Sequence, residues 1–173
     1  MNVFIMNLPG MIAILMWVIA YQTKKKKNLL AFGITAKLLW VTQYLLSGFR
    51  TAAAMNFIGA SRDVVYYTYA KKEIKKSIWV MVLFQLIAIT SVIITWKNFW
   101  SLLPGTSTII AAWMYWQDNM KIIRAGAFIT LLMWFGYNLA SGVYVALVSD
   151  VLCMTSVLTA IWRYDIRKEE AKI

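Results

Sequence analysis

Apolar residues fill the chain in long stretches, and short polar segments separate these stretches. A helix of about 20 mostly apolar residues is long enough to cross the roughly 30 Å hydrocarbon core of a membrane. The pattern therefore predicts an all-α integral membrane protein with seven transmembrane helices, at residues 3–22, 28–47, 51–70, 77–96, 99–117, 122–141 and 143–163. The predicted connections are too short to hold a soluble domain.

The composition supports a membrane protein and narrows its chemistry. Hydrophobic residues make up 61% of the chain and charged residues only 14%, whereas soluble domains carry about a quarter charged residues. The chain has no histidine and a single cysteine, Cys153. A histidine metal site, a histidine general base and a CxxC redox motif are thereby excluded. We expect neither an enzyme, nor a metal site, nor a cofactor.

The basic residues are distributed unevenly between the predicted loops. If the N-terminus lies outside, fourteen of the eighteen Lys and Arg fall in inner segments, and only Arg50 and Lys97 fall in outer loops. The positive-inside rule therefore predicts an outer N-terminus and a cytoplasmic C-terminus. The lysines at 24–27 follow the first apolar stretch, so we interpret that stretch as a span rather than a signal peptide. Anionic lipid headgroups account for the net charge of +11, and no nucleic-acid partner is expected.

Two parts of the chain are similar to each other. Displaced by 95 positions, Pro9-Gly10 coincides with Pro104-Gly105, and displaced by 94, six of the fifteen residues in 38–52 are identical to those in 132–146. Similarity of this kind indicates a parallel repeat, which is a known plan of membrane transporters. It predicts a 3+1+3 arrangement: a first three-helix repeat at 1–71, a linker helix at 72–97, a second three-helix repeat at 98–164 and a charged cytoplasmic tail at 165–173.

Short motifs in the first repeat resemble the second and third helices of SWEET-type sugar transporters. The resemblance is carried by Leu39-Trp40-Val41-Thr42-Gln43-Tyr44, the turn at Ser47-Gly48, and Asn56-Phe57-Ile58-Gly59. It implies that Trp40 and Trp134 form aromatic walls of a central substrate cavity, with Asn56 and Asp150 as its polar contacts. Asp150 stands where SWEETs have asparagine, and the proline of the related PQ-loop turn is absent.

Over most of its length the sequence more closely resembles the YgjV-type family of bacterial inner-membrane proteins. The resemblance is carried by Ile78-Trp79-Val80-Met81, Leu102-Leu103-Pro104-Gly105-Thr106, Met133-Trp134-Phe135 and Asn138-Leu139-Ala140-Ser141-Gly142. It implies a multi-pass protein of the bacterial inner (plasma) membrane, and it implies no activity.

Four ionisable residues lie well inside predicted spans: Lys37, Arg62, Asp63 and Asp150. Each costs about 2.5–3.5 kcal/mol at the centre of a spanning helix, so such residues face the bundle interior and pair. Their depths in the membrane predict a Lys37–Asp63 pair and an Arg62–Asp150 pair. The adjacent Arg62 and Asp63 project about 100° apart on their helix, so each is expected to need a partner on another helix. Two interpretations stay open: structural salt bridges between helices, or a charged-substrate or proton-coupled site in which Asp150 takes up the proton.

Two functions are compatible with these features. The first is a SWEET-like facilitator or proton-coupled carrier of a small polar or charged metabolite, which works by alternating access between the two repeats. The second is a non-transporting membrane scaffold, or a protein that interacts with lipids or partners. The expected partners are the lipid bilayer and, for a carrier, the metabolite and a proton, while homo-oligomer formation is left open. The two hypotheses differ in whether Trp40, Asn56, Trp134 and Asp150 converge on one cavity.

Overall fold

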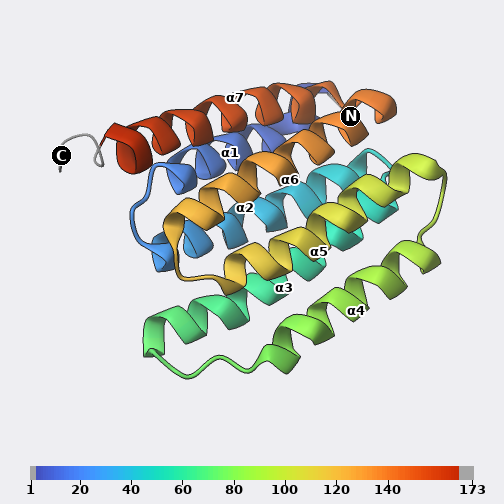
Figure 1. The fold of residues 1–173 in the computed structure, drawn as a ribbon. Helices are drawn as coiled ribbons and strands as arrows, with labels where there is room; N and C mark the ends of the chain where they lie inside the picture. Colours follow the sequence, from blue (N-terminus) through green and yellow to red (C-terminus); the bar gives the residue numbers. More distant parts are fainter. Residues whose placement is uncertain (1–2, 168–173) are drawn as a thin grey trace.

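The computed structural model describes residues 3–167, with side chains from residue 7 onward, and this part of the chain is helical with no strands. The predicted all-α fold with seven helices is confirmed (Figure 1). A 3₁₀ turn at Phe99–Ser101 precedes the fifth helix, and a π-helical turn at Trp162–Ile166 extends the seventh. The helices are α1 (Val3–Tyr21), α2 (Lys26–Leu46), α3 (Arg50–Lys72), α4 (Ile78–Ile94), α5 (Leu102–Trp116), α6 (Met120–Ser141) and α7 (Tyr144–Ile161).

Three of the described helical segments are long and apolar enough to cross a membrane by length and composition alone. They are α2, α6, and α7 with its π-helical extension, Tyr144–Ile166. The apolar part of α1, Asn7–Tyr21, and the helix α4 are shorter. In α3, which has 23 residues, charged side chains at both ends and in the middle lower the hydropathy. Seven membrane crossings therefore stay a prediction, as does the orientation of the termini.

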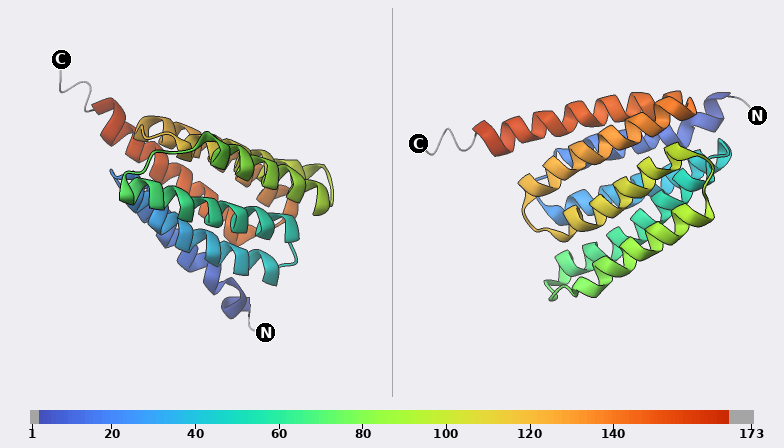
Figure 2. Two further views of the ribbon diagram at one scale, coloured as in Figure 1. Left: turned by 90° about the horizontal axis from the view of Figure 1, so that it is seen from below. Right: turned by 45° about the vertical axis from the view of Figure 1, so that its right-hand side comes forward.

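Six of the helices form a closed ring, and the seventh packs against its outside. Around the ring, each helix packs against the next in the order α1, α2, α3, α5, α6, α7, and α7 returns to α1. Helix α4 packs against α3 and α5 and lies at one edge of the molecule (Figures 1 and 2). The only residues of α4 that are buried are Ala88 and Val92. The beginning of α1 and the end of α7 lie at opposite ends of the bundle (Figure 2).

The same turn follows α2 and α6, at positions that the repeat aligns. Gly48 and Gly142 both adopt left-handed backbone conformations, with φ of 79° and 70°. The next N–H group reaches back five residues in each case, from Phe49 to the Tyr44 carbonyl at 2.8 Å and from Val143 to the Asn138 carbonyl at 3.1 Å. This is the Schellman ending of a helix, for which glycine is favoured because it lacks a Cβ. The identical Ser-Gly pairs of the sequence therefore form the same type of turn.

Helices α4 and α5 approach each other closely at Gly105. A Cβ atom at this position would overlap the side chain of Val92 on α4. We expect Gly105→Ala to lower the free energy of unfolding by about 1–3 kcal/mol, the usual cost of overpacking. Reversible denaturation in mixed detergent micelles measures this change. Val92→Ala in the same chain should recover part of it, and a double variant as unstable as the sum of the single variants would contradict the close contact.

Asp118, in the loop between α5 and α6, ties together three segments at the lysine-rich end of the bundle. Its carboxylate accepts hydrogen bonds from Lys26 at 3.0 Å and from Lys76 at 2.5 Å. Partial burial alone would raise the pKa of Asp118, but the two lysines more than offset this and hold its pKa below the usual value. The stability that these bonds contribute is therefore present above the ordinary carboxyl pKa and is lost as the pH falls through the lowered pKa. The contribution is small because the carboxylate is 74% exposed.

Candidate functional site

A buried cluster of three charged residues lies inside the ring. The Asp63 carboxylate accepts a hydrogen bond from Lys37 Nζ on α2 at 2.5 Å, as the sequence predicts. Its other oxygen accepts from Arg62 Nε at 2.9 Å and from Arg62 Nη2 at 2.7 Å. Arg62 Nη1 also donates to the Thr108 carbonyl on α5 at 3.3 Å. Arg62 and Asp63 are each 1% exposed. The cluster therefore joins α2, α3 and α5.

The predicted Arg62–Asp150 pair is wrong. Although the two Cβ atoms of Arg62 and Asp63 point in different directions, the long arginine side chain folds back onto its neighbour's carboxylate. Asp150, on α7, instead accepts a hydrogen bond from the Asn138 amide on α6 at 2.7 Å. The expectation that Arg62 and Asp63 each need a partner on another helix treated the direction of Cβ as decisive and neglected the reach of the guanidinium.

Asp150 belongs to a hydrogen-bonded chain across three helices. The Asn138 side chain donates to Asp150 and accepts from the Tyr44 hydroxyl on α2 at 2.8 Å. All three residues are buried. Sequence reasoning missed Asn138 as the partner of Asp150. Two signals point to it: it is an amide within an apolar helix, and the 94-residue repeat aligns it with Tyr44, the residue to which it bonds.

Aromatic rings continue from this chain toward the end of the bundle that holds the two Schellman turns. Tyr44 lies 5.5 Å from Trp40 and 5.8 Å from Trp134 between ring centroids. Trp134 contacts Tyr137 at 6.1 Å, and Tyr137 contacts Phe49 at 6.4 Å. Separations of this size are typical of favourable aromatic pairs. The rings form one connected row between the centre of the bundle and the loop at residues 47–49.

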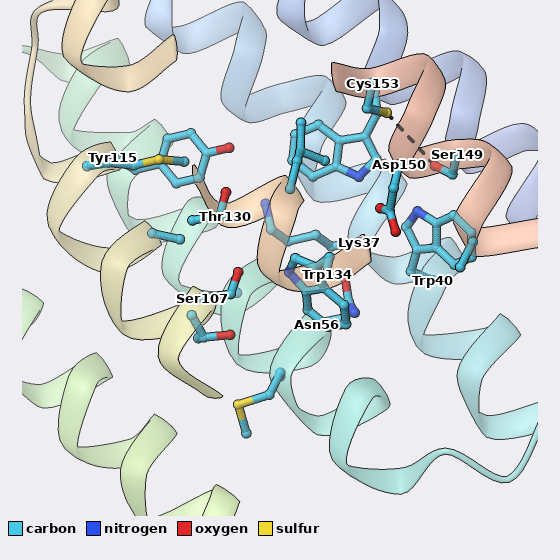
Figure 3. A pocket seen from close by; sticks show the side chains of 18 of the residues that line it. Lys37, Trp40, Asn56, Ser107, Tyr115, Thr130, Trp134, Ser149, Asp150 and Cys153 are labelled. Carbon is cyan, nitrogen blue, oxygen red and sulfur yellow. Dashed lines mark hydrogen bonds between the residues drawn. The ribbon is translucent and has the colours of Figure 1, made fainter. Parts of the chain in front are cut away.

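The four residues assigned to a substrate site in the sequence, Trp40, Asn56, Trp134 and Asp150, line one central cavity. Figure 3 shows their side chains together with that of Lys37, reaching this space from α2, α3, α6 and α7. The cavity volume is about 80 Å³, which is enough for several water molecules and well below the roughly 300–1,000 Å³ of pockets for drug-sized ligands. The other lining residues are Trp17, Tyr21, Lys37, Tyr44, Met55, Gly59, Arg62, Ser107, Thr108, Ala111, Met114, Tyr115, Thr130, Leu131, Ala146, Ser149 and Cys153.

The two cations of the charge cluster face this cavity, and Asp63 is not among its lining residues. The Lys37 ammonium lies 4.4 Å from the ring centroid of Trp17 and 5.2 Å from that of Tyr115. Distances of this size are attractive for a cation over an aromatic face. Gly59 makes room for the lysine, because a Cβ there would lie 3.1 Å from both Cδ and Cε of Lys37. One side of the cavity is therefore formed by the cations Lys37 and Arg62, while Asp63, the carboxylate that pairs with both, does not line the cavity.

Ionisable residues that face the inside of an apolar helical bundle and line a small internal cavity are characteristic of a polytopic helical membrane protein. The chain belongs to the Imp-YgjV family of bacterial inner membrane proteins, which it matches over residues 4–168. No curated protein and no solved structure is found to match it. The resemblance to this family read from the sequence is thus confirmed, and with it a place in the bacterial inner membrane.

Proposed function

We propose that this protein is a carrier of a small polar or charged metabolite that works by alternating access between two three-helix repeats. The observation that carries the proposal is the convergence of Trp40, Asn56, Trp134 and Asp150 on one cavity. These residues come from four helices and from both halves of the chain. Residues that only pack helices together have no need to share an internal space with buried charges. A substrate pathway requires such a space.

The positions that line the cavity support a two-fold relation between the halves. Displaced by 94 residues, Trp40 coincides with Trp134 and Asn56 with Asp150, and all four line the cavity. Two aligned residues, Tyr44 and Asn138, form a hydrogen bond with each other. Residues exchanged by a two-fold rotation can touch only where they lie near its axis. This supports an axis that passes through the centre of the ring, beside the cavity.

The packing order of the helices supports the same relation. The repeat pairs α1 with α5, α2 with α6 and α3 with α7. Under this pairing, the contacts α1–α2 and α2–α3 of the first half correspond to the contacts α5–α6 and α6–α7 of the second half. The two contacts between halves, α1 with α7 and α3 with α5, exchange with each other. Helix α4 has no counterpart and lies outside the ring. The 3+1+3 plan follows as part of this proposal, with α4 as the linker.

Asp150 is the residue we assign to proton coupling. Its carboxylate is 6% exposed, lines the cavity and pairs with the neutral Asn138 rather than with a cation. Protonation would remove a charge from the interior and weaken the bond that links Asp150 through Asn138 to Tyr44. Tyr44 in turn stacks on Trp134. A chain of direct contacts therefore connects the carboxylate of Asp150 to the row of aromatic rings.

Uptake by proteoliposomes tests the carrier function. Vesicles that contain the full chain are incubated with a water-soluble metabolite extract from bacterial cells, with and without an inward proton gradient, and the retained compounds are identified by mass spectrometry. We expect Trp134→Ala and Asp150→Asn to reduce uptake of the retained compound about tenfold or more, corresponding to at least about 1.4 kcal/mol. The matched control is Trp113→Ala on α5, because Trp113 is 48% exposed and does not line the cavity.

A scaffold function predicts a different result. The Lys37–Asp63–Arg62 cluster joins three helices, and such a cluster is also useful to a protein that transports nothing. If wild-type vesicles retain no compound above protein-free vesicles, or if the two cavity variants take up as much as the Trp113→Ala control, the carrier proposal is overturned.

A further inference from the structure

The cavity carries opposite net charges on different helices. Lys37 and Arg62 line it and share a single carboxylate, that of Asp63, so this group has a net charge of +1. Asp150 lines it from α7, and within residues 3–167 its carboxylate forms no ion pair. With all four groups ionised, the residues together are neutral, but neither Lys37 nor Arg62 pairs with Asp150, so the charge is separated. A neutral site with separated charges is complementary to a ligand that is itself neutral overall and charged at both ends.

This charge separation is a difference between two otherwise similar halves. Displaced by 94 residues, Lys37 coincides with Leu131 and Asp150 with Asn56. All four residues line the cavity. The aligned positions thus provide aromatic and polar side chains in both halves. The first half adds Lys37, Arg62 and Asp63, with a net charge of +1, and the second half adds the single negative charge of Asp150. The aromatic and polar lining is therefore similar in the two halves, whereas the net charge is positive in the first half and negative in the second.

Each end of the cavity has the surroundings that a charged organic group requires. On the negative side, the Asp150 side chain lies next to that of Trp40 (Figure 3), and a carboxylate beside an aromatic ring is a favourable place for an alkylammonium group. On the positive side, Lys37 has three N–H donors, of which one bonds to Asp63. A ligand carboxylate could accept from the remaining donors.

We propose that the cavity binds a small zwitterion, with its ammonium group at Asp150 and its carboxylate at Lys37 and Arg62. The inference deepens the proposed function and rests on it for the identity of the site. A ligand with net charge would leave an uncompensated charge in a buried, neutral site, which is costly. A neutral polyol would compensate neither the negative charge of Asp150 nor the net positive charge at Lys37 and Arg62. The cavity volume of about 80 Å³ limits the ligand to a few non-hydrogen atoms.

Equilibrium dialysis of the full chain in lipid nanodiscs tests the ligand class without requiring transport. The probes are radiolabelled glycine, β-alanine and γ-aminobutyrate, which differ in the separation of their charges, together with methylamine, acetate and glycerol. We expect at least one of the three zwitterions to bind about tenfold more tightly than methylamine and acetate, and glycerol not to bind measurably. Binding of methylamine, acetate or glycerol as tight as that of every zwitterion, or no binding of any zwitterion, overturns the proposal.

Variants locate the two ends of the ligand. Asp150→Asn and Lys37→Met should each raise the Kd of the bound zwitterion about tenfold or more, whereas the surface variants Asp118→Asn and Lys27→Met should leave it unchanged. Unchanged binding by folded Asp150→Asn protein overturns the assignment. If Lys37→Met does not fold, the comparison of probes on the wild-type chain still decides the ligand class.

The two proposals can fail separately. Zwitterion binding without vesicle uptake would support this inference and overturn the carrier function. Uptake of a metabolite of another class, with no zwitterion bound, would support the carrier function and overturn this inference.

Discussion

Replacing Asp63 by asparagine is expected to lower the free energy of unfolding by about 3–5 kcal/mol, because it removes the shared partner of two buried cations. Lys37 and Arg62 both donate to this carboxylate, and Arg62 is 1% exposed. An asparagine fits the space, but it keeps only one of the two acceptor oxygens and carries no charge. The measurement is reversible denaturation of the purified chain in mixed detergent micelles, followed by helical circular dichroism.

Two further variants separate the loss of charge compensation from general damage. Asp63→Asn combined with Lys37→Met leaves one buried cation instead of two, so it should be more stable than Asp63→Asn alone. Asp118→Asn removes a carboxylate that also pairs with two lysines but is 74% exposed, and it should cost at most about 1 kcal/mol. Equal losses for Asp63→Asn and Asp118→Asn would contradict a charge cluster sealed from solvent.

The helices of this fold are predictable from the sequence because the thickness of the membrane sets the length of each apolar stretch. A run of apolar residues and the polar segment that follows it define a helix and its end, and each of the seven predicted helices is present. The structure differs where local backbone geometry decides the boundary. Residues 99–101 form a separate 3₁₀ turn, so α5 begins at Leu102, and α4 ends at Ile94. Whether a helix crosses the membrane depends also on the bilayer, whose hydrocarbon thickness sets the length of apolar helix that is required.

The candidate site was predictable to the extent that the repeat and the cost of buried charge constrain it. An ionisable residue at the centre of an apolar helix must face inward, and the structure buries Lys37, Arg62, Asp63 and Asp150. Pairing within the site was harder to predict, because it depends on side-chain reach and competition for partners. Arg62 reaches the adjacent Asp63, while Asn138 takes the place at Asp150. An amide is less costly to bury than a charge and can bond to many different partners, so its position in the sequence does not specify which group it pairs with.

Asn138 is the residue for which the structure makes the most demanding prediction. Asn138→Leu keeps the approximate size of a side chain that is 1% exposed, but it removes both the donor to Asp150 and the acceptor for Tyr44. Leaving a buried polar group without its partner costs about 1–3 kcal/mol, and more for a charged group. We therefore expect the free energy of unfolding to fall by about 3 kcal/mol or more, measured by the same denaturation in mixed micelles.

Removing the Tyr44 hydroxyl and the Asp150 carboxylate, which Asn138→Leu leaves without a partner, should restore most of the lost free energy of unfolding. In Tyr44→Phe/Asn138→Leu/Asp150→Leu, the whole hydrogen-bonded chain is replaced by apolar side chains, and such complete replacement is often close to neutral. The triple variant should therefore be more stable than Asn138→Leu alone and should take up no substrate, since it lacks the carboxylate. The exposed control Asn28→Leu should change stability little. A triple variant no more stable than Asn138→Leu would mean that the amide acts by packing, and the link from Asp150 to the aromatic row would then have no energetic basis.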